Sequence, residues 1–126
     1  MAEKTTILLI DDEEDFAYFV KLNLERTGRF SVETVSRGAE GARTARTIKP
    51  DLILLDLLMP DMDGTEVAEQ LRESPATRDI PIVFLTALAQ KAEVEASDGV
   101  IGGRNYIAKP VEPGELAQRI ETLLGR

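Results

Sequence analysis

The sequence predicts one α/β domain, a doubly wound three-layer sandwich built on a five-stranded parallel sheet. Short, continuous apolar runs recur along the chain and are bounded by Asp, Pro or Thr, as in strands buried on both faces. Segments with apolar residues at three- and four-residue spacing lie between these runs, as in amphipathic helices. Strand and helix thus alternate five times, which favours parallel strands, right-handed crossovers and helices on both faces.

The expected strands are four continuous runs and one alternating segment. The continuous runs lie at residues 7–10, 52–55, 82–85 and, more weakly, 106–108. Residues 30–35 alternate apolar and polar side chains, which is typical of an edge strand with one wet face. The usual order for five such units is 2-1-3-4-5, the flavodoxin-like arrangement, which makes the first and third strands neighbours at the switch point.

The expected helices fill the gaps between the strands. Periodic apolar positions predict helices over residues 16–24, 39–48, 67–71 and 116–124. The segment 89–96 is the weakest helix, because Val94 is its only large apolar residue. Prolines at 50, 75 and 113 mark boundaries.

Length and composition limit the function classes. A chain of 126 residues is the size of one domain, so we expect a single domain over 1–126 with no output domain. Cysteine and histidine are absent, so any chemistry uses carboxylates, hydroxyls, lysines or a hard cation. A net charge of −8 opposes direct binding to nucleic acid or an anionic membrane. With no apolar run of membrane-spanning length, the chain is expected to be cytoplasmic.

Polar side chains follow four of the predicted strands. Asp11 and Asp12 follow the first, Asp56 ends the third, Thr86 the fourth and Lys109 the fifth. The carboxyl ends of parallel strands meet at one edge, where ligands of open α/β sheets bind. Three neighbouring carboxylates repel one another and favour a hard cation such as Mg²⁺, which would also neutralise a transferring phosphoryl group. Asp56 lies at the centre of this edge and is the best candidate for a phosphorylated nucleophile.

Each of these residues also has an ordinary structural interpretation. Asp12, followed by further acids to Asp15, resembles a helix start with acids in its first turn. Thr86 is also consistent with a helix cap, Lys109 with a surface lysine and Asp56 with a turn residue. The combination at four strand ends favours the functional interpretation.

The motifs that carry these residues resemble those of a known family. ILLIDDEEDF, DLILLDLLMPDMDG, IPIVFLTA and YIAKPVEPGEL follow one another along the chain, from residue 7 to residue 116, so the match extends over nearly its whole length. In order and spacing they resemble the receiver domain of two-component response regulators, in the single-domain form of chemotaxis response regulators. The resemblance implies that a sensor histidine kinase or a histidine phosphotransfer protein donates a phosphoryl group to Asp56, and that the output is an unknown downstream protein. It also implies a monomer or a weak phosphorylation-dependent dimer.

The resemblance assigns further roles within the site. Asp11, Asp12 and Asp56 would hold Mg²⁺, or Mn²⁺ in its place, together with the backbone carbonyl of Leu58. Thr86 and Tyr106 would act as the switch that remodels the surface of the fourth helix, fifth strand and fifth helix, while Lys109 contacts the phosphoryl group. The domain would not be an enzyme beyond catalysing its own phosphorylation and dephosphorylation.

Three features depart from the family pattern. Leu58 and Leu88 are apolar where relatives often have polar side chains, so we hypothesise that the rate of dephosphorylation differs from that of such relatives. An unchanged rate after replacing both leucines with polar residues would contradict this hypothesis. The segment 97–105 is rich in glycine, which allows a short or displaced fourth helix as well as a simple loop variant. Val111 replaces a common aromatic residue.

Two alternative functions are compatible with parts of the sequence. DMDGT at residues 61–65 matches the opening motif of haloacid-dehalogenase-type phosphohydrolases, with Asp61 as nucleophile. Pro60 argues against a central strand ending there, so Asp61 and Asp63 are interpreted as loop acids that help to start the third helix. The second alternative is a receiver-like interaction module that signals without phosphorylation, which the complete set of site residues disfavours.

Overall fold

The computed structural model describes residues 4–57, 59–86, 100–101, 104–108 and 112–125, in which helices and strands alternate as predicted. The expected fourth helix at 89–96 lies outside the described residues. None of the helices in the described part of the chain has the length and apolar character needed to cross a membrane. The elements are β1 (Thr5–Ile10), α1 (Glu14–Arg26), β2 (Phe30–Val35), α2 (Gly38–Ile48), β3 (Leu52–Asp56), α3 (Gly64–Glu73), β4 (Ile82–Thr86), β5 (Val100–Ile101), β6 (Arg104–Ala108) and α5 (Pro113–Leu123).

The sheet has the order β2-β1-β3-β4-β6-β5. The pairs from β2 to β6 are all parallel, so the predicted order of five parallel strands is confirmed, with β6 as the expected fifth strand. The strand β2 lies at an edge and alternates buried and exposed residues along most of its length, also as predicted. In addition to the five predicted parallel strands, the described residues include a short strand, β5, at the outer edge of the sheet.

The additional strand comes from the glycine-rich segment. Val100 pairs with Asn105 and Ile101 with Arg104, in an antiparallel ladder at the outer edge of the sheet. Two glycines separate the paired residues in the sequence, and a Gly-Gly pair is a strong signal for a two-residue hairpin. This signal was available in the sequence, where the segment was interpreted only as a loop or an altered helix.

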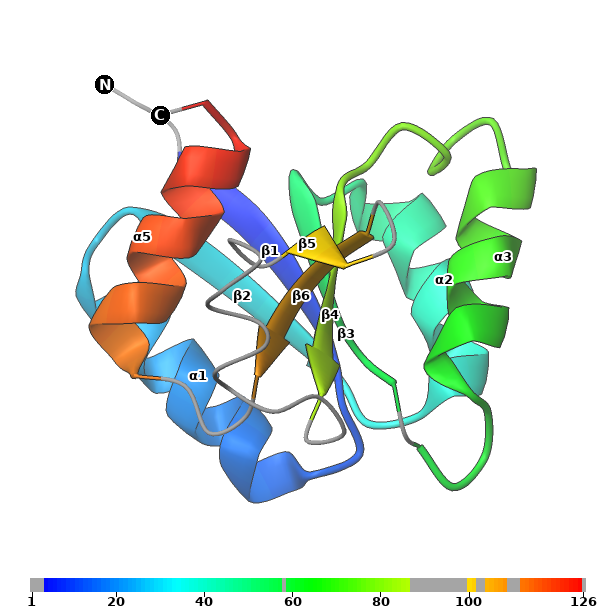
Figure 1. Ribbon diagram of the computed structural model, residues 1–126, viewed down its shortest axis with the longest axis horizontal. Coiled ribbons are helices and arrows are strands. Elements are labelled where there is room, and N and C mark those ends of the chain that lie inside the picture. The colour runs from blue at the N-terminus through cyan, green and yellow to red at the C-terminus, as the bar shows by residue number, and fades with distance from the viewer. Residues whose placement is uncertain (1–3, 58, 87–99, 102–103, 109–111, 126) are drawn as a thin grey trace.

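Helices cover both faces of the sheet, which explains the continuous apolar runs. Figure 1 shows α1 and α5 on one side of the sheet and α2 and α3 on the other. In β1, Ile7 and Leu9 pack in the cluster that includes α1 and α5, whereas Leu8 and Ile10 pack in the cluster that includes α2 and α3. All four side chains are fully buried. A parallel strand covered on both faces has no wet side on which polar residues could alternate.

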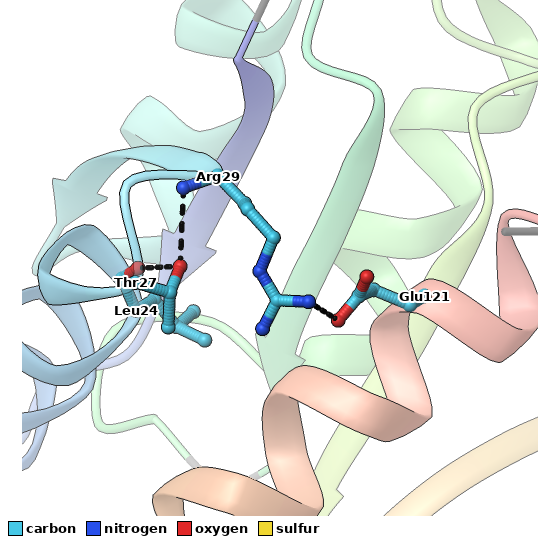
Figure 2. Close-up of polar contacts among 4 residues, drawn as sticks. All are labelled: Leu24, Thr27, Arg29 and Glu121. Atoms are coloured by element: carbon cyan, nitrogen blue, oxygen red, sulfur yellow. Dashed lines mark hydrogen bonds and ion pairs between the residues drawn. The ribbon is translucent and has the colours of Figure 1, made fainter.

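The turn between α1 and β2 is tied to α5 at the end of the sheet where the strands begin (Figure 2). The Thr27 hydroxyl donates to the carbonyl of Leu24 at 2.7 Å and accepts from the backbone N–H of Arg29 at 3.1 Å. Gly28 has φ +77°, a left-handed conformation that glycine adopts without strain. The guanidinium of Arg29 then reaches Glu121 of α5 at 2.6 Å. These contacts join two helices that share one face of the sheet.

Candidate metal and phosphorylation site

The three acids predicted to bind the metal, Asp11, Asp12 and Asp56, lie together where β1 and β3 end. The backbone N–H of Asp11, just after β1, donates to the carbonyl of Val35, and that of Leu57, just after β3, donates to the carbonyl of Leu85. These bonds extend the ladders beyond the strands and fix the backbone on which the acids stand. Asp11 is 1% exposed and Asp56 is 5% exposed, so both carboxylates are held inside the edge of the sheet.

Asp11, Asp12 and Asp56 form one cluster of carboxylates. One oxygen from each lies within 4.8 Å of the others, with Asp12 half-buried. The Oδ1 atom of Asp11 accepts a hydrogen bond from the backbone N–H of Glu13 at 2.9 Å, which fixes the orientation of this carboxylate. An all-oxygen donor set of carboxylates fits Mg²⁺, which prefers oxygen ligands and keeps several waters. The three carboxylates that were expected to meet at the ends of the first and third strands therefore lie together.

The acids that follow Asp12 in the sequence lie at the start of α1, as the structural interpretation of this segment expected. Helix α1 begins at Glu14 and has Glu14 and Asp15 in its first turn, where negative charge is favourable. Its N-cap residue, Glu13, makes no side-chain capping bond. Asp11 and Asp12 belong to the carboxylate cluster, whereas the following acids belong to the helix.

Thr86 and Tyr106 lie on neighbouring strands. Thr86 ends β4, is 2% exposed, and pairs with Ala108 at the end of β6. Tyr106 is half-buried and stacks on Phe84, with ring centroids 5.5 Å apart. Four predicted or discussed positions fall outside the described residues: Leu58, Leu88, Lys109 and Val111. Of these, Lys109 directly follows Ala108 in the sequence.

Gly64 allows α3 to begin against the end of β3. Its backbone N–H donates to the carbonyl of Leu57 at 2.9 Å. A Cβ atom at this position would lie 2.4 Å from the carbonyl oxygen of Asp56 and 2.8 Å from the Cα of Leu57. Because no side chain fits at these distances, the glycine that follows Asp63 is required by the backbone of the candidate phosphoacceptor.

Asp63 caps α3, as expected of an acid that starts the third helix. Its Oδ1 atom accepts from both the backbone N–H and the hydroxyl of Thr65, each at 2.9 Å. The hydrogen bond from the Thr65 N–H, followed by that from its hydroxyl, lowers the pKa of Asp63 below its ordinary value. The carboxylate is thus held in its charged form at the N-terminus of a helix.

Asp61 has a different role from the one expected. Its two oxygens accept hydrogen bonds from the backbone N–H groups of Gly38 and Ala39, both at 3.1 Å, so it caps α2 and not α3. The hydrogen bonds from Ala39 and then Gly38 lower the pKa of Asp61. Helix α2 needs this cap because its own N-cap residue, Arg37, makes no side-chain capping bond. An exposed acid engaged in this way does not fit a buried strand-end nucleophile, so the hydrolase alternative is wrong.

The chain is similar to known proteins over nearly its whole length. The family described as the response regulator receiver domain matches residues 7–121. The chain is 40% identical over 121 residues to the alkaline phosphatase synthesis transcriptional regulatory protein PhoP of Bacillus subtilis, covering 95% of this chain and 48% of that protein. It is 34% identical to the phosphate regulon transcriptional regulatory protein PhoB of Rhizobium meliloti, covering 95% of this chain and 52% of that protein. The chain therefore spans about half the length of these relatives.

Solved structures show the same fold. A response regulator from Chloroflexus aurantiacus has 31% identity and a TM-score of 0.81, with 98% of this chain and 100% of that chain covered. The receiver domain of the sensor histidine kinase PA1611 from Pseudomonas aeruginosa has 27% identity and a TM-score of 0.81 at the same coverage. That structure contains a magnesium ion coordinated in its active-site cleft.

Proposed function

Because the chain belongs to the response regulator receiver domain family, we propose that Asp56 is its phosphoacceptor and that Asp11, Asp12 and Asp56 bind Mg²⁺. The observation that carries this proposal is the cluster of three carboxylates within 4.8 Å at the carboxyl ends of β1 and β3. We include the backbone carbonyl of Leu58 among the ligands, and Mn²⁺ as an alternative ion. The Mg²⁺-containing receiver of PA1611 supports the choice of metal.

The proposed reaction transfers a phosphoryl group from histidine to aspartate. A carboxylate oxygen of Asp56 attacks the phosphorus, the P–N bond to the donor histidine breaks, and an acyl phosphate forms while the imidazole leaves with the bonding electrons. Bound Mg²⁺ would supply neutralisation of the charge on the phosphoryl oxygens. The buried position of Asp56 limits the access of water, and the Thr86 hydroxyl and Lys109 ammonium would contact the remaining oxygens. In this scheme the domain is a signalling module that catalyses only its own phosphorylation and dephosphorylation.

The phosphodonor would be a sensor histidine kinase or a histidine phosphotransfer protein. Such a partner must approach the carboxyl ends of the strands, where α1 begins at Glu14. Helix α1 exposes three large apolar side chains, with Tyr18 67%, Phe19 44% and Leu22 42% exposed. Exposed aromatic and aliphatic groups on one helix are typical of a protein-binding surface and support docking of the donor beside the site. The net charge of −8 also favours a protein partner over nucleic acid.

The signal to a downstream protein would follow from a conformational change at Thr86 and Tyr106. Phosphorylation adds charge and acceptor oxygens beside the Thr86 hydroxyl, which can bias a two-state element. Tyr106 stacks on Phe84 of β4, the strand that ends in Thr86, so the two proposed switch residues are linked through one strand. We expect an altered surface near α5 to bind an unknown downstream protein, as a cytoplasmic monomer or a weak phosphorylation-dependent dimer.

The test is phosphorylation of the intact chain by acetyl phosphate with Mg²⁺, followed by mass spectrometry. We expect the mass increase of one phosphoryl group in the wild-type protein, and none in Asp56→Asn, because the amide is not a comparable nucleophile. The matched control is Asp79→Asn, which makes the same chemical change at an exposed acid in the segment between α3 and β4 and should be phosphorylated like the wild type. No mass increase from acetyl phosphate or from any histidine kinase would instead support an interaction module that acts without phosphorylation.

A further inference from the structure

Asp61 joins two segments that are distant in sequence. It lies between β3 and α3, and its carboxylate accepts from the first backbone N–H groups of α2, 23 and 22 residues earlier. Both oxygens are used, so the contact fixes the orientation of the carboxylate as well as its position. Two orphan donors of the α2 N-terminus are satisfied by a residue outside that helix, where a side chain of the preceding turn would ordinarily serve.

The contact is supported by close packing. A Cβ atom on Gly38, the first residue of α2, would lie 3.0 Å from the Cβ of Met62 and 3.2 Å from the Cε of Met59. Met59 is 8% exposed and Met62 is half-buried. The start of α2 therefore rests directly on the segment that contains Asp61, and the hydrogen bonds lie at the border of a packed apolar contact.

The same segment is anchored at its two ends by backbone hydrogen bonds. At its start, the N–H of Leu57 donates to the carbonyl of Leu85 in β4 at 3.1 Å. At its end, the N–H of Gly64 donates back to the carbonyl of Leu57 at 2.9 Å. Between these anchors, Asp61 makes the side-chain hydrogen bonds that attach the segment to α2.

We infer that Asp61 is a positioning residue for the metal and phosphorylation site, because it holds the segment that follows Asp56 against α2. This inference rests on the proposed function. A loop held in its binding conformation loses less conformational entropy when it contributes to a metal site, so its affinity for the metal is higher. Without the attachment, the backbone anchors at Leu57 and Gly64 would remain, but residues 59–63 would lose their link to α2.

Electrostatic attraction is the alternative explanation for any effect of Asp61. Asp12 and Asp61 line the same groove, together with Arg37, so removing the charge of Asp61 weakens the attraction for a cation even if the hydrogen bonds are irrelevant. Asp63 separates the two explanations. It carries the same charge in the same loop and also caps a helix, but within the described residues the hydrogen bonds of its side chain go to Thr65 and not to another helix or strand.

The experiment is a calorimetric titration of the full chain with Mg²⁺, for the wild type and for Asp61→Ala, Asp61→Asn and Asp63→Ala. We expect Asp61→Ala to raise the Kd for Mg²⁺ about tenfold, the lower end of the range for residues that support metal ligands. Asp61→Asn retains one carbonyl acceptor and should give an intermediate Kd. Asp63→Ala should raise the Kd much less, and the difference from Asp61→Ala should persist at high salt, where charge effects are screened.

A second measurement reports the attachment without metal. Amide hydrogen exchange should accelerate at Gly38 and Ala39 in Asp61→Ala, and remain as in the wild type in Asp63→Ala. This inference would be overturned if Asp61→Ala and Asp63→Ala bound Mg²⁺ with equal affinity, or if Asp61→Ala bound it as tightly as the wild type. Neither result would affect the proposed function. Absence of Mg²⁺ binding by the wild-type protein would overturn the proposed function and this inference together.

Discussion

The two ends of the central sheet differ in how they treat buried polar groups. At the amino end, the Thr77 hydroxyl is buried and donates to the carbonyl of Leu71 at 2.6 Å, so a donor meets an acceptor. At the carboxyl end, Asp11 also accepts from the Glu13 N–H, but the carboxylates of Asp11, Asp12 and Asp56 lie together, so groups of like charge are neighbours. A fold needs only the first arrangement, because neighbouring like charges raise the free energy of the folded state.

The difference supports the proposed metal site at the carboxyl end, whereas the contacts described at the amino end stabilise the fold. The first turns of α1, α2 and α3 all begin at the carboxyl end, at Glu14, Gly38 and Gly64. Their N-termini carry partial positive charge toward the edge where the acids gather. At the amino end, the ion pair joins the exposed side chain of Arg29 to the half-buried side chain of Glu121, which is typical of a surface contact (Figure 2).

The largest effect on stability is expected at the carboxyl end, from Gly64→Ala. The added Cβ would lie 2.4 Å from the carbonyl oxygen of Asp56, and neither backbone can move without disturbing the end of β3 or the start of α3. We expect a loss of about 3 kcal/mol in the free energy of unfolding, the upper part of the range for overpacking. Urea denaturation followed by far-UV circular dichroism measures it.

The control for this substitution is Gly114→Ala. Gly114 lies in the first turn of α5, and a Cβ there would contact no atom within 4 Å. Alanine has the higher helix propensity and reduces the freedom of the unfolded chain, so we expect a gain of about 0.5–1 kcal/mol. A similar loss of stability in both variants would show that the close approach at Gly64 is unimportant.

The comparison of the two ends also explains what the sequence could predict. Asp11, Asp56 and Thr86 could be placed together because continuous apolar runs identify strands, and parallel strands bring their carboxyl ends to one edge. Each step uses a local pattern and a general rule of topology. The cap that Asp63 provides for α3 is also local, since its partner is Thr65.

Contacts between elements could not be predicted in the same way. The partners of Asp61 are backbone N–H groups of α2, and backbone groups have no signature in the sequence. Only the packing of α2 beside α3 brings them to Asp61, so the acid was assigned to the wrong helix. The strand β5 is a different case, because the glycines at 102 and 103 carry a hairpin signal in the sequence, whereas the segment 97–105 was interpreted as a loop variant or as a change to the fourth helix.

A smaller effect on stability is expected from removing one of the like charges at the carboxyl end. Asp56→Asn removes one of three carboxylates whose oxygens lie within 4.8 Å. At the effective dielectric constant of a partly buried site, one such repulsion contributes about 1–3 kcal/mol, so the variant should be more stable than the wild type by about that amount without metal. Thermal denaturation at low ionic strength measures the difference. Added Mg²⁺ should then raise the Tm of the wild type more than that of the variant.

The control makes the same substitution at the amino end. Asp79→Asn removes an exposed acid from the segment between α3 and β4, so it should change the Tm little and leave the response to Mg²⁺ as in the wild type. If Asp56→Asn were less stable than the wild type in the absence of Mg²⁺, the carboxylates of the cluster would be mutually compatible in the folded state. The contrast between the two ends of the sheet would then be lost.

The smallest effect is expected at the amino end, from the ion pair of Arg29 and Glu121. The pair is short, at 2.6 Å, but its side chains are 55% and 27% exposed, so solvent screens the attraction. A double-mutant cycle with both alanine substitutions should give a coupling free energy of about 0.5 kcal/mol that falls as salt is added. The looser pair of Arg43 and Glu40, 3.9 Å apart within α2, should couple still more weakly. A coupling above about 1.5 kcal/mol, or a slower phosphorylation of Arg29→Ala, would mean that the amino end does more than stabilise the fold.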